Sequence, residues 1–329
     1  MRQIRLGAGA VALIALVAVP MVTDSFATTL VTRGMTWGLL GLAVWFLLRI
    51  SNLPSFGHAA FFGVAAYSAG LAVTEWQITN LFVTLALSVL LTCLVAVPIA
   101  LVTTRLSGIA FLLVTLAFAE MLRSLALRWR AVGGSDGLVG VTRPDTWPLP
   151  LSLATPSHFY YVVLAVLLIC AVLLVVVIGS PFGGVLAGLR ESEPRMSALG
   201  YNPMFYRVAA FVLSAALAGV AGVMQTYLDR FANPEDLGAL VSARGLLIAV
   251  IAGASLWAVP VTAIALTIVE DLLSTQTTHW MGLIGVIYIV VSLLPNTSTQ
   301  VADLRRLVRR RIARRNPPEP RVADQKESV

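Results

Sequence analysis

The sequence contains very little lysine. Lys326 is the single lysine among 329 residues. A nucleotide-binding P-loop needs a lysine after its glycine-rich turn, and Schiff-base chemistry needs a lysine buried in a site. Both kinds of chemistry are therefore excluded from this chain. If the protein performs work that ATP drives, another chain must hydrolyse the ATP.

Other residues that build catalytic or metal sites are also scarce. The three histidines, His58, His158 and His279, lie in separate segments, and Cys93 and Cys170 lie inside apolar runs. No HExxH or CxxC motif occurs. We expect the cysteines to pack as small apolar side chains, because a disulfide needs an oxidising compartment and matched geometry. The sequence predicts no metal, no cofactor and no catalytic residue on this chain.

Charged residues of any kind are few. They make up 12% of the chain, against about 25% in a typical soluble domain. Apolar residues make up 58%, and the mean hydropathy is +0.87. These values leave no room for a soluble domain. The sequence predicts an all-α polytopic membrane protein, with a transmembrane domain over residues 1–300 and a basic tail over residues 301–329.

Apolar runs set the expected spans, because about twenty apolar residues cross the hydrocarbon of a bilayer. Pro260 divides the long run at 244–274, which predicts a hairpin of two short helices and a total of about ten. One kinked helix there is the alternative, with a total of about nine. We expect the first run to be a retained helix rather than a cleaved signal peptide. The expected runs are 7–23, 29–50, 57–75, 80–103, 108–128, 159–179, 206–228, 244–274 and 281–295.

The distribution of positive charge predicts the orientation. The net charge is +7, and most of the excess lies in Leu304–Arg315, after the last apolar run. Clusters of this kind stay in the cytoplasm and contact anionic lipid, which we favour over nucleic-acid binding. Ten helices place both termini and the polar segment 180–205 in the cytoplasm, whereas nine would place the basic tail outside. We therefore expect a multi-pass protein of the bacterial inner membrane with both termini inside.

One substantial polar segment separates two apolar runs in the middle of the chain. Ser180–Pro203 carries arginines and glutamates in a helical pattern, followed by the helix-stop residues Gly200, Asn202 and Pro203. An amphipathic segment of this length can form short helices at the membrane surface. A soluble partner could hold such helices and thereby move the membrane domain.

Ionisable residues inside the apolar runs are rare. Glu120 and Arg123 are three residues apart, which places them on one helix face as a gate or pathway pair, or as a structural ion pair near the outer edge. Gly57 and Gly63 interrupt an apolar run that also contains His58. Unwound backbone of this kind can line a transport site, although plain helix packing and a hydrogen-bonding histidine at a helix start explain the pattern equally well. We hypothesise that Gly57, His58 and Gly63 approach the transport route together with Glu120.

Several segments together resemble the LivM-type permease subunits of branched-chain amino acid ABC importers. The resemblance covers most of residues 30–295, in the order expected for the family. The matching segments are SFGHAAFFGVAAYSAG (55–70), LVTLAFAEMLR (113–123), VGGSDGLVGV (132–141), GLRESEPRMSALGYN (188–202) and AFVLSAALAGVAGVMQ (210–225).

The resemblance implies a non-catalytic permease subunit of an importer. The segment 188–202 would be the coupling loop that docks on the ATPase, with Arg190, Glu191, Glu193 and Gly200 at the family positions. The implied partners are a second, LivH-like permease subunit, two ATPase subunits that bind the ATP, an extracytoplasmic solute-binding protein and membrane lipid. Branched-chain amino acids are the expected solutes, and urea, other amino acids and small aromatic acids are alternatives within the same importer class.

Two other classes of function remain as alternatives. A secondary transporter would carry internal repeats and deep coupling charges, and the sequence shows no clear repeat and few such charges. A membrane enzyme acting on a lipid-linked substrate would need carboxylates, histidines or lysines clustered at one face of the membrane. The scattered histidines and the single lysine argue against that class.

Overall fold

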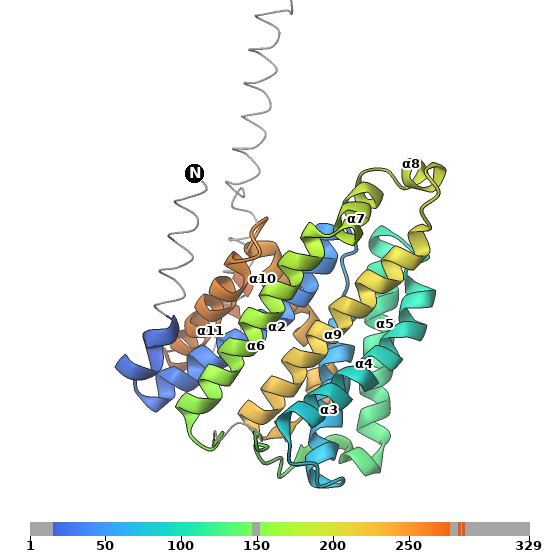
Figure 1. Ribbon diagram of the computed structural model, residues 1–329. Coiled ribbons are helices and arrows are strands. Elements are labelled where there is room, and N and C mark those ends of the chain that lie inside the picture. The colour runs from blue at the N-terminus through green and yellow to red at the C-terminus, as the bar shows by residue number, and fades with distance from the viewer. Residues whose placement is uncertain (1–15, 147–151, 277–281, 284, 287–329) are drawn as a thin grey trace, which may run out of the picture.

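The computed structural model describes residues 16–146, 152–276, 282–283 and 285–286, which form a helical bundle (Figure 1). Six helices in this part of the chain are long and apolar enough to cross a membrane, which confirms the all-α polytopic class. These are α2 (Ser25–Ile50), α4 (Leu81–Thr103), α5 (Gly108–Arg128), α6 (Pro156–Gly179), α9 (Pro203–Asp229) and α11 (Ala258–Gln276). The shorter helices are α3 (His58–Thr74), α7 (Pro181–Glu191), α8 (Glu193–Ala198) and α10 (Ala239–Ile251).

Not every expected span falls within the described residues. Most of 7–23, all but a few residues of 281–295, and the basic tail lie outside them. The total of about ten helices therefore stays a prediction. Both cysteines are described, and neither forms a disulfide.

Polar caps explain where several helices begin. The Asp24 carboxylate accepts from the backbone N–H of Ala27 at 3.0 Å, so α2 starts earlier than the apolar run alone indicates. Asn202 accepts from the N–H of Met204 at 3.1 Å, and Pro203 occupies the first position of α9. The interpretation of Asn202 and Pro203 as helix-stop residues was therefore wrong, because they form the start of the next helix.

The 244–274 run forms a hairpin of two helices, α10 and α11, as expected. The chain breaks at 252–257, where Gly253 has a φ of 68°, and not at Pro260. Pro260 lies in the first turn of α11, where no N–H is needed for an intrahelical hydrogen bond. The indole Nε1 of Trp45 in α2 donates to the carbonyl of Gly253 at 2.8 Å, which fixes the break against the bundle.

One pattern of elements occurs twice along the chain. A long helix, an irregular segment, a short helix and another long helix follow one another in α2–α4 and again in α9–α11. The long helices α2 and α9 are antiparallel, because Thr36 bonds to Gln225 whereas Ser214 bonds to the carbonyl of Ala43. In addition, α4 packs against α9, and α11 packs against α2. The second unit is therefore inverted relative to the first.

The two short helices begin side by side inside the bundle. The backbone N–H of Ala59 in α3 donates to the Ser242 hydroxyl in α10 at 2.9 Å. From there α3 runs toward the small sheet of β1 (Leu138–Val139) and β2 (Phe231–Ala232), and α10 runs toward the end that carries α7 and α8. Broken helices with inverted directions are typical of transport proteins.

Glycines shape the connection that leads to β1. This connection contains the 3₁₀ turns η1 (Arg130–Val132) and η2 (Gly134–Asp136), and a third turn, η3 (Pro234–Leu237), precedes α10. Gly133 has a φ of 88°, and a Cβ there would lie 2.0 Å from the carbonyl oxygen of Gly137. Only glycine fits this turn, as the GGSDGL segment predicts.

Candidate functional site

The helices α7 and α8 project from one end of the bundle (Figure 1). A Cβ on Gly183 would lie 2.4 Å from the carbonyl oxygen of Ile178, so glycine permits the chain to turn directly from α6 into α7. Val185, Leu186 and Leu189 are buried on one side of α7. No residue of α8 is buried. The predicted short amphipathic helices are thus present, and α8 is open to a partner.

The charged residues of this unit attach it to two long helices. A guanidinium nitrogen of Arg190 donates to the carbonyl of Arg49 in the last turn of α2. Arg207 in α9 donates to both carboxylate oxygens of Glu193, at 3.3 and 2.6 Å. A force on α7 or α8 would therefore reach α2 and α9 directly.

The other two expected coupling residues face outward. Glu191 is exposed at the end of α7. Gly200 has a φ of 88° and ends the turn after α8, with nothing within 4 Å of the position where a Cβ would lie. Of the four expected coupling residues, Arg190 and Glu193 bind their own chain, and Glu191 and Gly200 remain open to a partner.

A second group of charges lies on α5, toward the opposite end of the bundle. Arg123 contacts a carboxylate oxygen of Glu120 at 3.5 Å and forms a shorter ion pair with Glu235 in η3. The other oxygen of Glu120 accepts from the backbone N–H of Ala239 at 3.1 Å, at the start of α10. A carboxylate is favoured there by the partial positive charge of a helix N-terminus. We call Glu120, Arg123 and Glu235 the α5 charge cluster.

The α5 charge cluster is only partly covered by the chain. The exposed fractions of the side chains are 42% for Glu120, 29% for Arg123 and 61% for Glu235. Glu120 follows Gly108 by twelve residues, which is roughly 18 Å along the helix. Ionised side chains at such a depth are too costly to face lipid tails. This surface must therefore contact water or another protein chain.

The remaining residues expected at the pathway have different surroundings. A Cβ on Gly57 would lie 3.0 Å from the Thr115 Cβ in α5, so this glycine allows α3 to start close to α5. A Cβ on Gly63 would lie 2.4 Å from the Leu237 side chain, which fixes α3 against η3. Both glycines thus adjoin elements that also hold the α5 charge cluster.

His58 points to a different part of the bundle. Its Nε2 lies 2.7 Å from the Ser214 hydroxyl, which donates to the carbonyl of Ala43 at 2.6 Å. The residue is 1% exposed. The structure therefore separates His58 from Glu120 and places it as a hydrogen-bonding residue at a helix start, among α2 and α9. Its role in the pathway stays a prediction.

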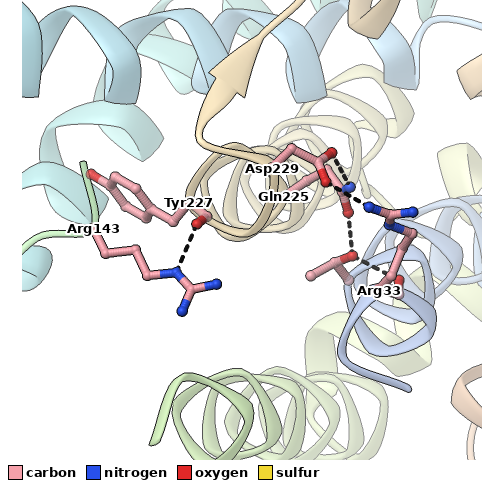
Figure 2. Close-up of polar contacts among 6 residues, drawn as sticks. Arg33, Arg143, Gln225, Tyr227 and Asp229 are labelled. Carbon is pink, nitrogen blue, oxygen red and sulfur yellow. Dashed lines mark hydrogen bonds and ion pairs between the residues drawn. The ribbon is translucent and has the colours of Figure 1, made fainter. Parts of the chain in front are cut away.

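Sequence reasoning missed a polar network at the end of the bundle opposite α7 and α8. Arg33 of α2 lies 3.0 Å from the Asp229 carboxylate of α9, and the Gln225 amide donates to the same carboxylate at 2.6 Å (Figure 2). Nearby, Arg143 donates to the carbonyl of Tyr227 at 3.1 Å (Figure 2). Its guanidinium also lies 4.3 Å above the ring of Phe159. Polar residues at the ends of apolar runs were the only signal available.

A second missed pair lies inside the hairpin. Arg244 of α10 forms a close ion pair with Glu270 of α11, and its guanidinium lies 4.1 Å above the Trp37 ring of α2. The pair joins the hairpin to the long helix behind it. Opposite rare charges on consecutive helices could have indicated this contact.

The chain matches a known family over residues 26–293, described as branched-chain amino acid transport system / permease component. The chain belongs to this family. It is also similar to two proteins named high-affinity branched-chain amino acid transport system permease protein LivM, from Salmonella typhimurium and Escherichia coli. Each is 27% identical over 318 residues, which cover 88% of this chain and 75% of the relative. No solved structure matches.

These findings confirm the resemblance seen in the sequence. The chain is a multi-pass membrane permease component of a transport system. Its function is therefore the passage of a solute across a membrane. The inverted broken helices form a structural repeat, although the sequence shows no clear repeat. Such helices are typical of proteins that move solutes.

Proposed function

We propose that this chain is a permease subunit of an ATP-driven importer that moves branched-chain amino acids into the cell. The family match over residues 26–293 is the observation that carries the proposal. Both LivM relatives are named for high-affinity branched-chain amino acid transport. The proposed assembly contains a second permease subunit, two ATPase subunits and an extracytoplasmic binding protein.

The α7–α8 unit is the proposed contact with the ATPase. It offers exposed Glu191 and Gly200 to a partner, while Arg190 and Glu193 fasten it to α2 and α9. Closure of the ATPase subunits would pull on this unit. The two anchored helices, α2 and α9, would then carry the movement to the irregular segments that follow them, 51–57 and 230–238.

The proposed orientation places α7 and α8 in the cytoplasm, with both termini, in a bacterial inner membrane. The basic segment Leu304–Arg315 supplies the excess of arginine that the positive-inside rule requires on the cytoplasmic side. An alkaline phosphatase fusion at Thr146 should be active, and one at the C-terminus inactive. An active C-terminal fusion would contradict this topology.

The α5 charge cluster marks the proposed route. Partly exposed Glu120, Arg123 and Glu235 cannot face lipid tails, so we place the second permease subunit against this surface, with water between the two chains. The neutral zwitterion of an amino acid would pass such a polar wall more easily than a bare hydrocarbon surface.

The test is reconstitution of this chain with the permease, ATPase and binding protein encoded beside it. Proteoliposomes that contain ATP should accumulate labelled leucine, and omission of the ATPase should stop uptake. Accumulation of urea or benzoate without leucine would overturn the substrate assignment. Accumulation without any ATPase would overturn the importer itself.

A further inference from the structure

A pocket of about 280 Å³ lies at the α7–α8 end of the bundle. Its wall comes from four places in the chain: the connection between α2 and α3, the start of α5, the end of α7 and the start of α9. The expected coupling residue Arg190 forms part of this wall, beside Arg207. The pocket therefore lies between the coupling unit and the membrane helices.

The charge of the pocket is positive. Arg207 is paired with Glu193, but none of the ion pairs within the described residues involves Arg190. The Arg190 guanidinium donates to the backbone carbonyl of Arg49, whose own side chain is also a cation. One guanidinium charge at the pocket thus lacks a counter-ion.

The start of α5 adds hydrogen-bond donors to the same wall. Ser107 precedes the helix but forms no side-chain cap, so its hydroxyl does not occupy the first backbone N–H groups. Gly108 lines the pocket as the first residue of the helix. Free N–H groups and the positive end of a 21-residue helix together favour an anion.

A buried hydroxyl gives a second and independent sign of a ligand. Ser51 lines the pocket and is 8% exposed, yet its Oγ has no hydrogen-bond partner within the described residues. Buried polar side chains are normally hydrogen-bonded, because burial of an unmet donor is costly. An oxyanion in the pocket would accept this hydrogen bond.

We propose that the pocket binds the phosphate group of an anionic lipid. Under the orientation proposed above, on which this inference rests, the pocket lies at the headgroup level of the cytoplasmic leaflet. Directly beyond Gly108, Ile109 and Leu113 are 77% and 55% exposed on α5 and offer an apolar surface to the acyl chains. Basic pockets at cytoplasmic helix ends are suited to anionic headgroups.

The bound phosphate joins elements that the chain alone connects weakly. It accepts hydrogen bonds from Arg190 of α7, Ser51 after α2 and the first N–H groups of α5. The lipid thereby ties the coupling unit to α5, which carries the charge cluster farther along the same helix. Coupling in this importer then depends on anionic lipid in the membrane.

The test is lipid retention by the purified importer, measured by native mass spectrometry after exchange into phosphatidylglycerol or zwitterionic phosphatidylcholine. Ser107→Asp is the decisive variant, because its carboxylate caps α5 and occupies the anion position. It should retain phosphatidylglycerol about tenfold more weakly than wild type without a lower melting temperature, since hydrogen bonds to charged groups are lost. Arg190→Gln should weaken retention similarly. Arg195→Gln, which removes an exposed arginine of α8, is the matched control and should match wild type.

Two results would overturn the proposal: equal retention of both lipids by wild type, or wild-type retention of phosphatidylglycerol by Ser107→Asp. Inorganic phosphate separates the two possible sources of the anion. If phosphate stabilises the importer in phosphatidylcholine as much as phosphatidylglycerol does, a free ion and not a lipid fills the pocket. Because retention is measured without transport, failure of leucine uptake would count against the proposed function and not against this site.

Discussion

Each inverted unit has an irregular segment before its short helix: residues 51–57 before α3 are the first break, and residues 230–238 before α10 are the second. The two breaks differ in chemistry. At the first break, before α3, His58 is 1% exposed and bonds to Ser214, and Gly57 packs against α5. At the second break, before α10, exposed Glu235 and the carboxylate of Glu120 meet Arg123. Neutral buried contacts close the first break, whereas screened ionic contacts close the second. We therefore expect the first break to stay fixed during transport and the second to open.

Removal of the cation from the second break should have the largest effect. Arg123→Leu leaves Glu120 and Glu235 facing each other without a positive partner, so both folded yield and leucine uptake should fall strongly. A stranded charge costs about 3 kcal/mol where it is well buried, and less at this partly exposed site. The double variant Glu120→Gln/Arg123→Leu should recover part of the yield, as measured by size-exclusion chromatography. A lower folded yield for the double variant than for Arg123→Leu would show that these contacts are not ionic in origin.

Neutralisation of Glu120 separates function from folding at the same break. The amide oxygen of Glu120→Gln can still accept from the N–H of Ala239, so we expect a wild-type melting temperature. Uptake should fall about tenfold, because a neutral group no longer forms a charge-assisted contact that opens and closes. Full uptake would show that the pair is structural only.

The first break should respond in the opposite manner. Ser214→Ala removes the partner of the His58 Nε2 in a buried setting, which should lower stability by about 1–3 kcal/mol. Uptake per folded molecule should change little if this break is a fixed joint. Thermal unfolding and transport by the same preparation measure both quantities. Lost uptake at unchanged stability would show that the first break, and not the second, opens during transport.

Loss of a cap at the second break should have the smallest effect. Asn233 accepts from the N–H of Glu235 at 3.0 Å, and its own N–H donates to Asp236 at 2.9 Å. Asn233→Ala should lower stability by about 1 kcal/mol. Asn202→Ala removes a cap of similar geometry from α9 and is the control. If the second break is the mobile one, only Asn233→Ala should also increase cleavage of the 230–238 segment by protease.

Local patterns in the sequence predicted what local physics decides. Apolar runs located the long helices, and the polar segment after Ser180 became α7 and α8, as its amphipathic pattern indicates. The three-residue spacing of Glu120 and Arg123 predicted a contact that the structure contains. Each of these features depends on residues close together in the chain.

Contacts between distant segments could not be predicted in this way. Glu235 and Ala239 reach the α5 pair from 112 and 119 residues away, and His58 meets Ser214 across 156 residues. Helix packing decides such contacts, and no local spacing encodes it. Pro260 shows the same limit, since proline is accepted in a first helical turn as readily as at a break.

We propose that the α7–α8 unit transmits force from the ATPase through its attachment to α9. The most direct measurement is ATP-driven leucine uptake by Glu193→Lys and by the charge exchange Glu193→Lys/Arg207→Glu. We predict no uptake for the single variant, because Lys would face Arg207, and recovered uptake when the exchange restores the ion pair. Normal uptake by Glu193→Lys, with the ATPase still co-purifying, would contradict it.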